Sequence, residues 1–325
     1  MKVHQGDASF AQPSAAVVTS GTFDGVHVGH QKILGRLKEL ARQTGGETVV
    51  VTYWPHPRMV LYPNDPAIQL LTTFEEKLAL LDALGIDHLV QIPFTKEFSQ
   101  LSSDAFVRQV LVDKIGTRHL VIGYDHHFGR NREGGFSYLK EHATEYGFAV
   151  EEIPRQDVDQ VGVSSTKIRN ALEAGQVHTA REYLGRPYRL TGTVVRVDQL
   201  GRKLGYPTAN LRIDSPHKLI PADGIYAVHV EWAGLHPVGP HLAGPRYEGM
   251  LYIGHRPTVQ GKSRNIEVNI FNFDQTIYGD ELRVDLLERT RGDLTFDSLE
   301  ALTVQLGEDQ KAVAALLEQY PKRAF

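Results

Sequence analysis

The chain has 325 residues, which at about 100–200 residues per domain predicts two domains. It is 41% hydrophobic and 23% charged, and its net charge of −4 without a dense Lys/Arg block argues against nucleic acid as a partner. The absence of cysteine excludes disulfides and thiolate chemistry, and neither a signal-peptide pattern nor an apolar run of about 18 residues is present, so we expect a cytoplasmic protein that does not enter membranes.

The first half of the chain alternates between apolar runs and segments of helical spacing. Strands are expected at 15–20, 48–54, 88–92, 118–122 and 148–153. Helices are expected where apolar residues recur every three or four positions, at 28–42, 73–84, 102–114 and 135–146. This alternation predicts an α/β domain with a mostly parallel sheet and helices on both of its faces.

After about residue 184 the pattern changes to short β-rich runs separated by Gly and Pro. These runs predict a small β-barrel, with strands at 189–197, 224–232, 249–253, 265–273 and 281–288. A closing helix is expected at 298–319, with Asp297 as its N-cap and Glu300 three positions later. We therefore predict domains at 1–184 and 185–325, with a linker near 175–188.

A glycine-rich segment, GTFDGVHVGH, follows the first expected strand. His27 and His30 are three residues apart, so they share a face of the first turn of the next helix. That helix also directs its free N–H groups toward the same place. A capping or surface role is the alternative for either histidine alone, whereas the pair favours phosphate binding. The backbone can approach a ligand closely at three glycines, Gly21, Gly25 and Gly29.

Three further polar clusters are WPHPR (54–58), GYDHHFGRNREG (123–134) and SSTKIR (164–169). The first two follow expected strands, and ligands of open α/β sheets bind beyond the carboxyl ends of the strands. SSTKIR opens a helix, where hydroxyl side chains are ordinary N-caps, but Lys167 and Arg169 oppose the helix dipole there. A bound anion would remove that conflict, so the clusters together indicate a nucleotide site.

The four segments resemble the motifs of the cytidylyltransferase-like nucleotidyltransferases, in the form that bacterial FAD synthetases carry. The resemblance implies a Rossmann-like domain in which the phosphate of FMN attacks the α-phosphorus of ATP and pyrophosphate leaves. It implies that His27 and His30 act on the ATP phosphates as catalytic residues. Further ATP contacts are implied for Gly21, Phe23, Asp24, Gly29, Ser164, Ser165, Thr166 and Arg169, and contacts with adenine or flavin for His56, Pro57, Tyr124, Asp125 and Phe128.

The second half contains GRKLGYPTANL (201–211), which combines glycines, basic residues and two polar side chains. Thr208 and Asn210 are two positions apart, so they point to the same side of a strand. A hydroxyl and an amide oxygen side by side suit Mg²⁺ together with ATP oxygens. The alternative is a polar stripe on an exposed strand.

A later segment, RNIEVNIFNFD, alternates as a strand should. Glu267 is expected to share one face of that strand with Asn269, Phe271 and Phe273. A carboxylate in this setting is either a solvated edge residue or a general base. A kinase that phosphorylates an alcohol needs such a base, because the attacking hydroxyl must lose its proton.

These segments resemble flavokinase, as do DGIYAV (223–228), GMLYIGHRPTV (249–259) and IYGDELRVDLLERTR (277–291). The resemblance implies that Thr208 and Asn210 hold Mg²⁺ with ATP, and that Glu267 activates the 5′-hydroxyl of riboflavin. It also implies ATP contacts for Gly201, Lys203, Gly205 and Pro207, and a flavin contact for Arg291.

Together the two resemblances cover nearly the whole chain, in the order found in the bacterial bifunctional riboflavin kinase/FMN adenylyltransferase family. They imply Mg²⁺ with ATP, the small molecules riboflavin, FMN, FAD, ADP and pyrophosphate as partners, and no obligate protein partner. Val197 and His127 replace residues that are common in these families, so an enzyme with one decayed site is an alternative. A flavin-binding sensor without turnover is another, but it would not need Thr208, Asn210 and Glu267 together.

Overall fold

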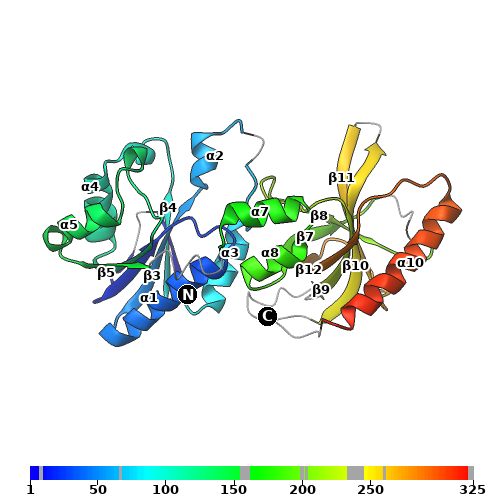
Figure 1. Ribbon diagram of the computed structural model, residues 1–325, viewed down its shortest axis with the longest axis horizontal. Coiled ribbons are helices and arrows are strands. Elements are labelled where there is room, and N and C mark those ends of the chain that lie inside the picture. Colours follow the sequence, from blue (N-terminus) through cyan, green and yellow to red (C-terminus); the bar gives the residue numbers. More distant parts are fainter. Residues whose placement is uncertain are drawn as a thin grey trace. The chain divides into compact units, whose positions relative to one another are not determined.

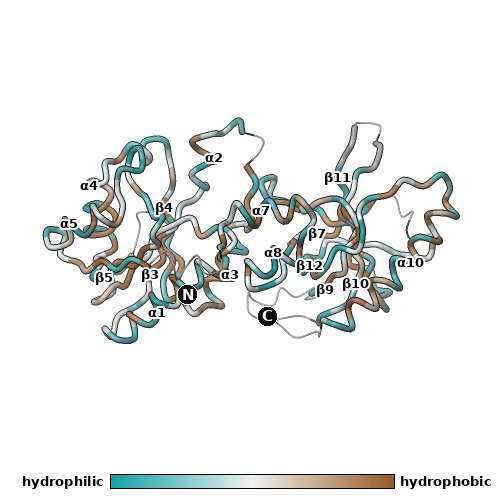
Figure 2. The backbone as a smooth tube through the Cα atoms, in the orientation of Figure 1, coloured by the Kyte–Doolittle hydropathy of each residue, from teal (hydrophilic) through white to brown (hydrophobic). Residues whose placement is uncertain are grey.

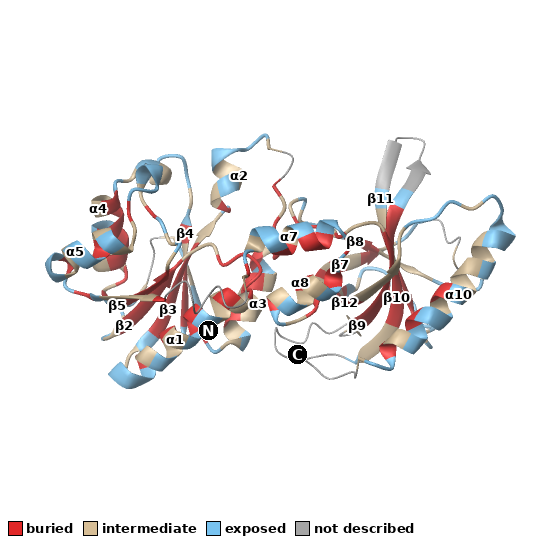
Figure 3. Ribbon diagram, viewed as in Figure 1, coloured by how far each residue is buried: buried red, intermediate tan, exposed pale blue. Residues whose placement is uncertain are grey.

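The computed structural model describes residues 1–6, 10–65, 68–153, 162–197, 201, 204–232, 245–258 and 261–320. Its contacts divide the chain into two compact units, Met1–Ser165 and Thr166–Phe325 (Figure 1). This division precedes the boundary at 184/185 that the sequence suggested, which stays a prediction about the limits of the two catalytic domains. Each unit has its own buried core (Figure 3).

A six-stranded parallel sheet forms the centre of the first unit, in the order β1-β4-β3-β2-β5-β6. Its strands are β1 (Lys2–Gln5), β2 (Ala16–Ser20), β3 (Glu47–Trp54), β4 (His88–Pro93), β5 (Thr117–Gly123) and β6 (Ala149–Ile153). The five predicted strands are confirmed. The edge strand β1 was not predicted, because its sequence KVHQ has one apolar residue and its side chains are mostly exposed.

Helices cover both faces of this sheet, as the alternating pattern predicted. They are α1 (Val28–Thr44), α2 (Pro57–Leu61), α3 (Phe74–Ala83), α4 (Ser103–Phe106), the π-helix η2 (Val107–Lys114) and α5 (Phe136–Tyr146), with short 3₁₀ turns η1 (Phe98–Gln100) and η3 (Arg130–Arg132). Successive residues of β2 face opposite sides. Val17 packs with α1 and α3, whereas Ala16 and Val18 pack with α4, η2 and α5. The brown, apolar stretches in Figure 2 follow these strands.

The second unit is a closed barrel of six strands, in the order β10-β11-β8-β7-β12-β9. The strands are β7 (Tyr188–Val195), β8 (Ala209–Arg212), β9 (Gly224–Trp232), β10 (Arg246–Thr258), β11 (Gly261–Ile270) and β12 (Glu281–Arg291). The predicted barrel is therefore confirmed. β11 ends at Ile270, so Phe271 and Phe273 do not share the strand face of Glu267, and that expectation was wrong.

Among the described residues, the helices that accompany the barrel are α7 (Ser165–Glu173), α8 (Val177–Leu184) and α10 (Leu299–Leu317). The segment expected as a linker near 175–188 contains α8, because Val177, Ala180 and Leu184 are buried and the helix packs on β12 and β7. The closing helix α10 is confirmed, but its N-cap is Ser298, whose hydroxyl accepts from the Ala301 amide at 3.1 Å. The assignment of the cap to Asp297 was one residue too early.

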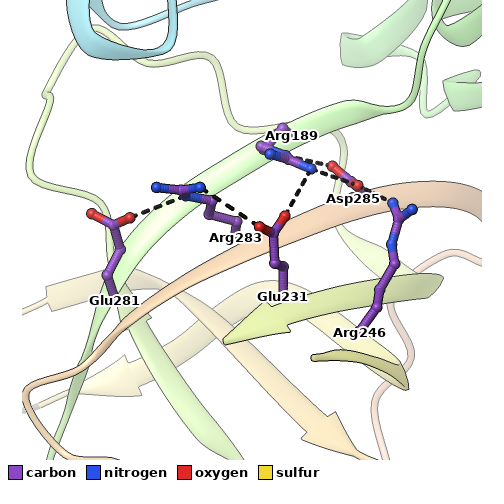
Figure 4. A network of polar contacts seen from close by, with 6 residues as sticks. All are labelled: Arg189, Glu231, Arg246, Glu281, Arg283 and Asp285. Carbon is purple, nitrogen blue, oxygen red and sulfur yellow. Dashed lines mark hydrogen bonds and ion pairs between the residues drawn. The ribbon is translucent and has the colours of Figure 1, made fainter. Parts of the chain in front are cut away.

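A network of charged side chains ties four barrel strands together (Figure 4). The buried Asp285 of β12 accepts two hydrogen bonds from Arg189 of β7, at 2.7 and 2.9 Å, and is also paired with Arg246 of β10. Arg189 reaches Glu231 of β9 at 3.4 Å. Arg283 extends the network from Glu231 to the exposed Glu281. Because two guanidinium groups satisfy the buried carboxylate, the network fixes the mutual register of these strands.

Candidate functional sites

The loop that follows β2 has an unusual backbone path. Phe23, Gly25 and Val26 have φ angles of 47°, 82° and 40°, in the left-handed region that residues with a Cβ rarely adopt. The loop starts as a continuation of the sheet, because the Gly21 amide donates to the Val51 carbonyl at 3.0 Å. Non-glycine residues in this conformation cost about 1–3 kcal/mol each, and such strain concentrates at functional sites.

His27 and His30 meet at the start of α1, as predicted. His27 is the N-cap of the helix, and its Nδ1 accepts from the His30 amide at 3.3 Å. The two rings stack with their centroids 3.6 Å apart, and the Phe23 ring packs edge-on against His30 at 5.1 Å. Since Nδ1 of His27 accepts, Nε2 is the ring nitrogen that carries the hydrogen and can donate. Two stacked imidazoles at the N-terminus of a 17-residue helix form a place suited to an anion.

Asp24 holds the same loop from within. Its buried carboxylate accepts from the amides of Leu71 and Thr72, at 2.9 and 3.1 Å. The Thr72 hydroxyl in turn accepts from the Gly25 amide at 3.2 Å. The Asp24 side chain therefore shapes the loop, whereas the direct ATP contact implied for it stays a prediction.

Three neighbouring strands bring their carboxyl ends to this loop. The hydroxyls of Ser20 (β2) and Tyr53 (β3) are 2.7 Å apart, and the His126 ring, after β5, hydrogen-bonds to the Ser20 backbone. Burial raises the pKa of Tyr53 to about 12 and lowers that of His126 to about 4, so both groups are neutral at pH 7. β2 lies between β3 and β5, at the change of strand order where such sheets bind ligands.

The WPHPR segment leaves β3 and turns into α2. His56 is the buried N-cap of this short helix, and its Nδ1 accepts from the Arg58 amide at 3.2 Å. Pro57 is the first helical residue, a position where a missing N–H costs nothing. Trp54 packs on Phe74 of α3, with ring centroids 5.3 Å apart. The His56 side chain thus caps the backbone of α2, and its contact with adenine or flavin stays a prediction.

The residues expected near adenine or flavin after β5 divide into two groups. Asp125 is exposed and Tyr124 is half-buried. Phe128 is buried in the core, with its ring 5.2 Å from that of Phe106. Phe128 therefore anchors the segment, and the flavin contact implied for it stays a prediction.

The SSTKIR segment lies where the two units divide. Ser164 and Ser165 belong to the first unit, and the Ser165 hydroxyl donates to the Asp24 carbonyl at 3.0 Å. This bond joins the start of α7 to the loop that carries His27. Thr166 and Arg169 belong to the second unit, so their part in a phosphate site stays a prediction.

One buried residue near this loop was not expected from the sequence. Lys77 lies in α3 and is 2% exposed. It stands beside Leu78 and Leu81 in the sequence, where a lysine normally marks the solvent face of an amphipathic helix. The spacing of apolar residues therefore gave no signal that this lysine is buried.

In the barrel, Thr208 and Glu267 are in direct contact. Glu267 lies in β11 and is 5% exposed, and the Thr208 hydroxyl donates to its Oε2 at 3.1 Å. Asn210 of β8 is the register partner of Glu267. On the same strand the buried Asn269 donates to the Pro207 carbonyl at 2.7 Å, which fixes the PTAN segment against β11. The three residues singled out in the sequence are thus neighbours.

A cavity of about 200 Å³ opens beside these residues. Thr208 and Asn210 line it on one side. Other walls come from β7 through Val194, and from the segment after β11 through Phe273 and Ile277. A polar edge facing an apolar enclosure of this kind suits a ligand with a charged end and a flat apolar end.

The GRKLG segment makes a tight turn ahead of Thr208. The amides of Leu204 and Tyr206 both donate to the Gly201 carbonyl, at 3.1 and 2.8 Å. A Cβ at Gly201 would lie 2.5 Å from the Tyr206 carbonyl oxygen and 3.2 Å from the Thr208 hydroxyl, so the turn requires glycine there. Gly205 has a φ of 84°. Lys203 lies outside the described residues.

Arg291, expected to touch flavin, is held by the protein itself. Its Nε and Nη2 donate to the two carboxylate oxygens of Asp309 in α10, at 2.8 and 2.6 Å. Its Nη1 donates to the Gly292 carbonyl at 2.8 Å, and Gln305 also donates to Asp309, at 2.9 Å. This cluster fastens α10 to the end of β12, and a flavin contact of Arg291 stays a prediction.

The donor atoms in the barrel fit a magnesium ion. Thr208, Asn210 and Glu267 offer a hydroxyl, an amide and a carboxylate oxygen, all hard ligands. Thr208 donates its hydrogen to Glu267, so its oxygen lone pairs remain for a cation. Across the described part of the chain there is no cluster of three or more His, Asp or Glu side chains arranged for a metal. Such sparse ligation is usual for Mg²⁺, because substrate phosphates complete its shell.

Comparison with protein families gives two matches that follow each other along the chain. Residues 9–167 match the FAD synthetase family, and residues 184–317 match the riboflavin kinase family. The first match contains the loop with His27 and His30, and the second contains Thr208, Asn210 and Glu267.

Relatives in several bacteria are similar over nearly their full length. A bifunctional riboflavin kinase/FMN adenylyltransferase of Pseudomonas fluorescens is 36% identical, over 92% of each chain. Those of Listeria monocytogenes and Escherichia coli K12 are 36% and 34% identical, over 92% and 95% of this chain and 91% and 96% of their own.

One solved structure has the same fold over 93% of this chain and 94% of its own. It is described as a macrolide-efflux protein from Streptococcus pneumoniae, with a TM-score of 0.81 and 30% identity. In the portion of our chain that is described, we find no helix with the length and apolar character needed to cross a membrane.

Proposed function

The chain belongs to the family of bifunctional riboflavin kinase/FMN adenylyltransferases, and from that premise we propose which of its residues perform the two reactions. The barrel unit is the kinase, which phosphorylates riboflavin to FMN. The α/β unit is the adenylyltransferase, which converts FMN to FAD. The observation that carries the assignment is the pair of separate constellations, stacked histidines on a helix N-terminus and a buried Glu267 bonded to Thr208.

In the kinase reaction, Glu267 is the general base. The 5′-oxygen of riboflavin attacks the γ-phosphorus of ATP, its proton passes to the Glu267 carboxylate, and the bond from the γ-phosphorus to the bridging oxygen breaks to release ADP. The bond from Thr208 and the burial of Glu267 support this role, because they hold one oxygen still. Asn210, the register partner of Glu267 on β8, binds beside it at the ATP phosphates.

ATP of the kinase reaction occupies the cavity beside Thr208 and Asn210. Its adenine lies among the apolar walls that include Val194 and Ile277, and its phosphates lie toward the polar edge. Thr208 and Asn210 would hold Mg²⁺, which would neutralise charge on the phosphates. Gly201 and Gly205 shape the turn beside these phosphates, and Lys203 adds a charge to them. Pro207 is held at its carbonyl by Asn269.

In the adenylyltransferase reaction, the protein positions two phosphates and stabilises charge. An oxygen of the FMN phosphate attacks the α-phosphorus of ATP, and the bond to the α–β bridging oxygen breaks to release pyrophosphate. His27 and His30, with the first amides of α1, donate to the phosphate oxygens where charge develops. The stacking of the two rings supports this role because it fixes both donors in one place.

We also propose that the enzyme works in the cytoplasm on small molecules alone, with neither nucleic acid nor another protein as an obligate partner. Riboflavin, FMN and ATP are the substrates, and FAD, ADP and pyrophosphate are released. The net charge of −4 supports the absence of nucleic acid from this set.

Product analysis tests the proposed function. Purified protein with riboflavin, ATP and Mg²⁺ is expected to form FMN and then FAD, measured by chromatography with flavin fluorescence. Removal of Mg²⁺ by a chelator should stop both reactions. FMN alone would reject the assignment for the first unit, and tight flavin binding without any ATP consumption would support a sensor instead.

A further inference from the structure

A buried lysine lies behind the phosphate loop, and neither reaction described above uses it. Lys77 is in the middle of α3 and is 2% exposed. Lysine is almost never fully buried without a partner, because removing an ammonium group from water is costly. The question is therefore what this charge does in the interior.

Two aromatic rings form one side of its environment. The Lys77 ammonium lies 5.8 Å from the centre of the Trp54 ring and 6.0 Å from that of Phe74. Both distances are within the range of cation–π attraction, which is strongest for tryptophan and for desolvated cations. Trp54 is the first residue of the WPHPR segment, in which the family resemblance implies that His56 and Pro57 contact adenine or flavin, so Lys77 lies against that segment.

A carboxylate also acts on Lys77 electrostatically. Asp24, in the loop before His27, attracts Lys77, and this attraction opposes the effect of burial. Burial lowers the pKa of Lys77 to about 8, so the ammonium is charged at pH 7. Asp24 uses its carboxylate to hold the Leu71 and Thr72 amides, so it is a fixed point of the loop.

We propose that Lys77 is a positioning residue of the adenylyltransferase site, whose buried charge holds the phosphate loop and the WPHPR segment in their correct relation. It acts through Asp24 on one side and Trp54 on the other, and touches no reacting atom. The proposal rests on the phosphate role proposed for His27 and His30. It adds Lys77 as a residue that holds the phosphate loop and the WPHPR segment together.

The main test is the substitution Lys77→Met, which keeps the length of the side chain and removes its charge. We expect kcat/KM for FMN adenylylation to fall about 100-fold, as a small misplacement of a binding loop can do. The loss should appear mainly as a higher KM for ATP. A smaller fraction of folded enzyme would instead lower kcat and leave KM unchanged. Riboflavin phosphorylation, in the other unit, should be unchanged.

The control is Lys140→Met. Lys140 lies in α5 of the same unit, is exposed, and has a similar aromatic contact, 5.8 Å from the Phe136 ring. This variant should keep both activities. If the wild-type protein forms FAD and Lys77→Met has the same KM for ATP, the proposal is overturned. If the wild-type protein forms no FAD, the proposed function itself is overturned.

A double-mutant cycle tests the route through Asp24. If Lys77 acts by compensating the Asp24 charge, the effects of Lys77→Met and Asp24→Asn on KM must be non-additive, because each removes the same electrostatic attraction. Additive effects would contradict the proposal.

The pH profile of the wild-type enzyme provides a test that needs no variant. Among the described residues, Asp24 is the charged group that faces Lys77 from the loop, while Trp54 and Phe74 are apolar. Glu76, on the same helix, is engaged with the Thr73 amide at 3.0 Å. Because the pKa of a cationic group is lowered to about 8, the charge is present below that pH and lost above it. We expect kcat/KM for adenylylation to fall as the pH rises through about 8, and a flat profile there would contradict the proposal.

Discussion

At the scale of single residues, the two sites use different physics. The proposed kinase site relies on one buried carboxylate, Glu267, which accepts a hydrogen bond from the Thr208 hydroxyl. The proposed adenylyltransferase site relies on two donors at a helix N-terminus, His27 and His30. The first must move a proton, whereas the second must stabilise charge on phosphates that carry their own nucleophile.

The substitution Glu267→Gln distinguishes the kinase site from the adenylyltransferase site. The amide keeps the shape of the side chain and can still accept from Thr208, but it cannot take the proton of the 5′-hydroxyl. We expect riboflavin phosphorylation to fall by roughly 10²- to 10⁴-fold, the usual contribution of a general base. Adenylylation of added FMN is the internal control and should persist. Loss of both reactions in a folded variant would argue against separate sites.

At the scale of elements, the sequence predicted what hydrophobic periodicity can show. Five of the six strands of the sheet, the main helices and the barrel follow from apolar runs that must be buried. The edge strand β1 did not, because only Val3 of its residues is hydrophobic and its stability comes from pairing with β4. Helix α8 lies in the segment expected as a linker. Its eight residues carry only a short apolar stripe, and that stripe is buried because the helix packs on the barrel.

The candidate site was predictable to a similar extent. Motif spacing predicted that His27 and His30 lie together and that Thr208 and Asn210 share one side of a strand. That these two lie beside Glu267 depends on the register of β8 against β11, so before the structure it was implied only by the resemblance to flavokinase. Lys77 was not predictable. Its burial results from the fold of the loop and the WPHPR segment around it, and the residues next to it in the sequence do not indicate that burial.

The barrel network offers a stability prediction at this scale. Asp285→Asn leaves the guanidinium groups of Arg189 and Arg246 without their buried counter-charge. We expect it to lower the free energy of unfolding by about 3 kcal/mol, the range for breaking one side of a buried ion pair. Glu281→Gln, on the same strand but with an exposed side chain, should cost less than about 1 kcal/mol. Denaturant unfolding measures both, and equal effects would show that the network does not hold the strands.

At the scale of the whole molecule, the chain joins two complete folding units, each with its own core and its own nucleotide chemistry. The closed barrel has no open edge, and the parallel sheet is covered on both faces, so neither unit requires the other to bury its apolar surface. FMN is the product of one site and the substrate of the other. The central claim is therefore that each unit catalyses its own step.

Mixing two defective variants tests this claim most directly. Glu267→Gln should lack the kinase reaction and His30→Ala the adenylyltransferase reaction, so neither variant alone should form FAD from riboflavin, ATP and Mg²⁺. Combined in one tube, they should form FAD, because FMN released by His30→Ala is adenylylated by Glu267→Gln. A mixture of the two folded variants that still forms no FAD, although each retains its own half-reaction, would contradict the independence of the two sites.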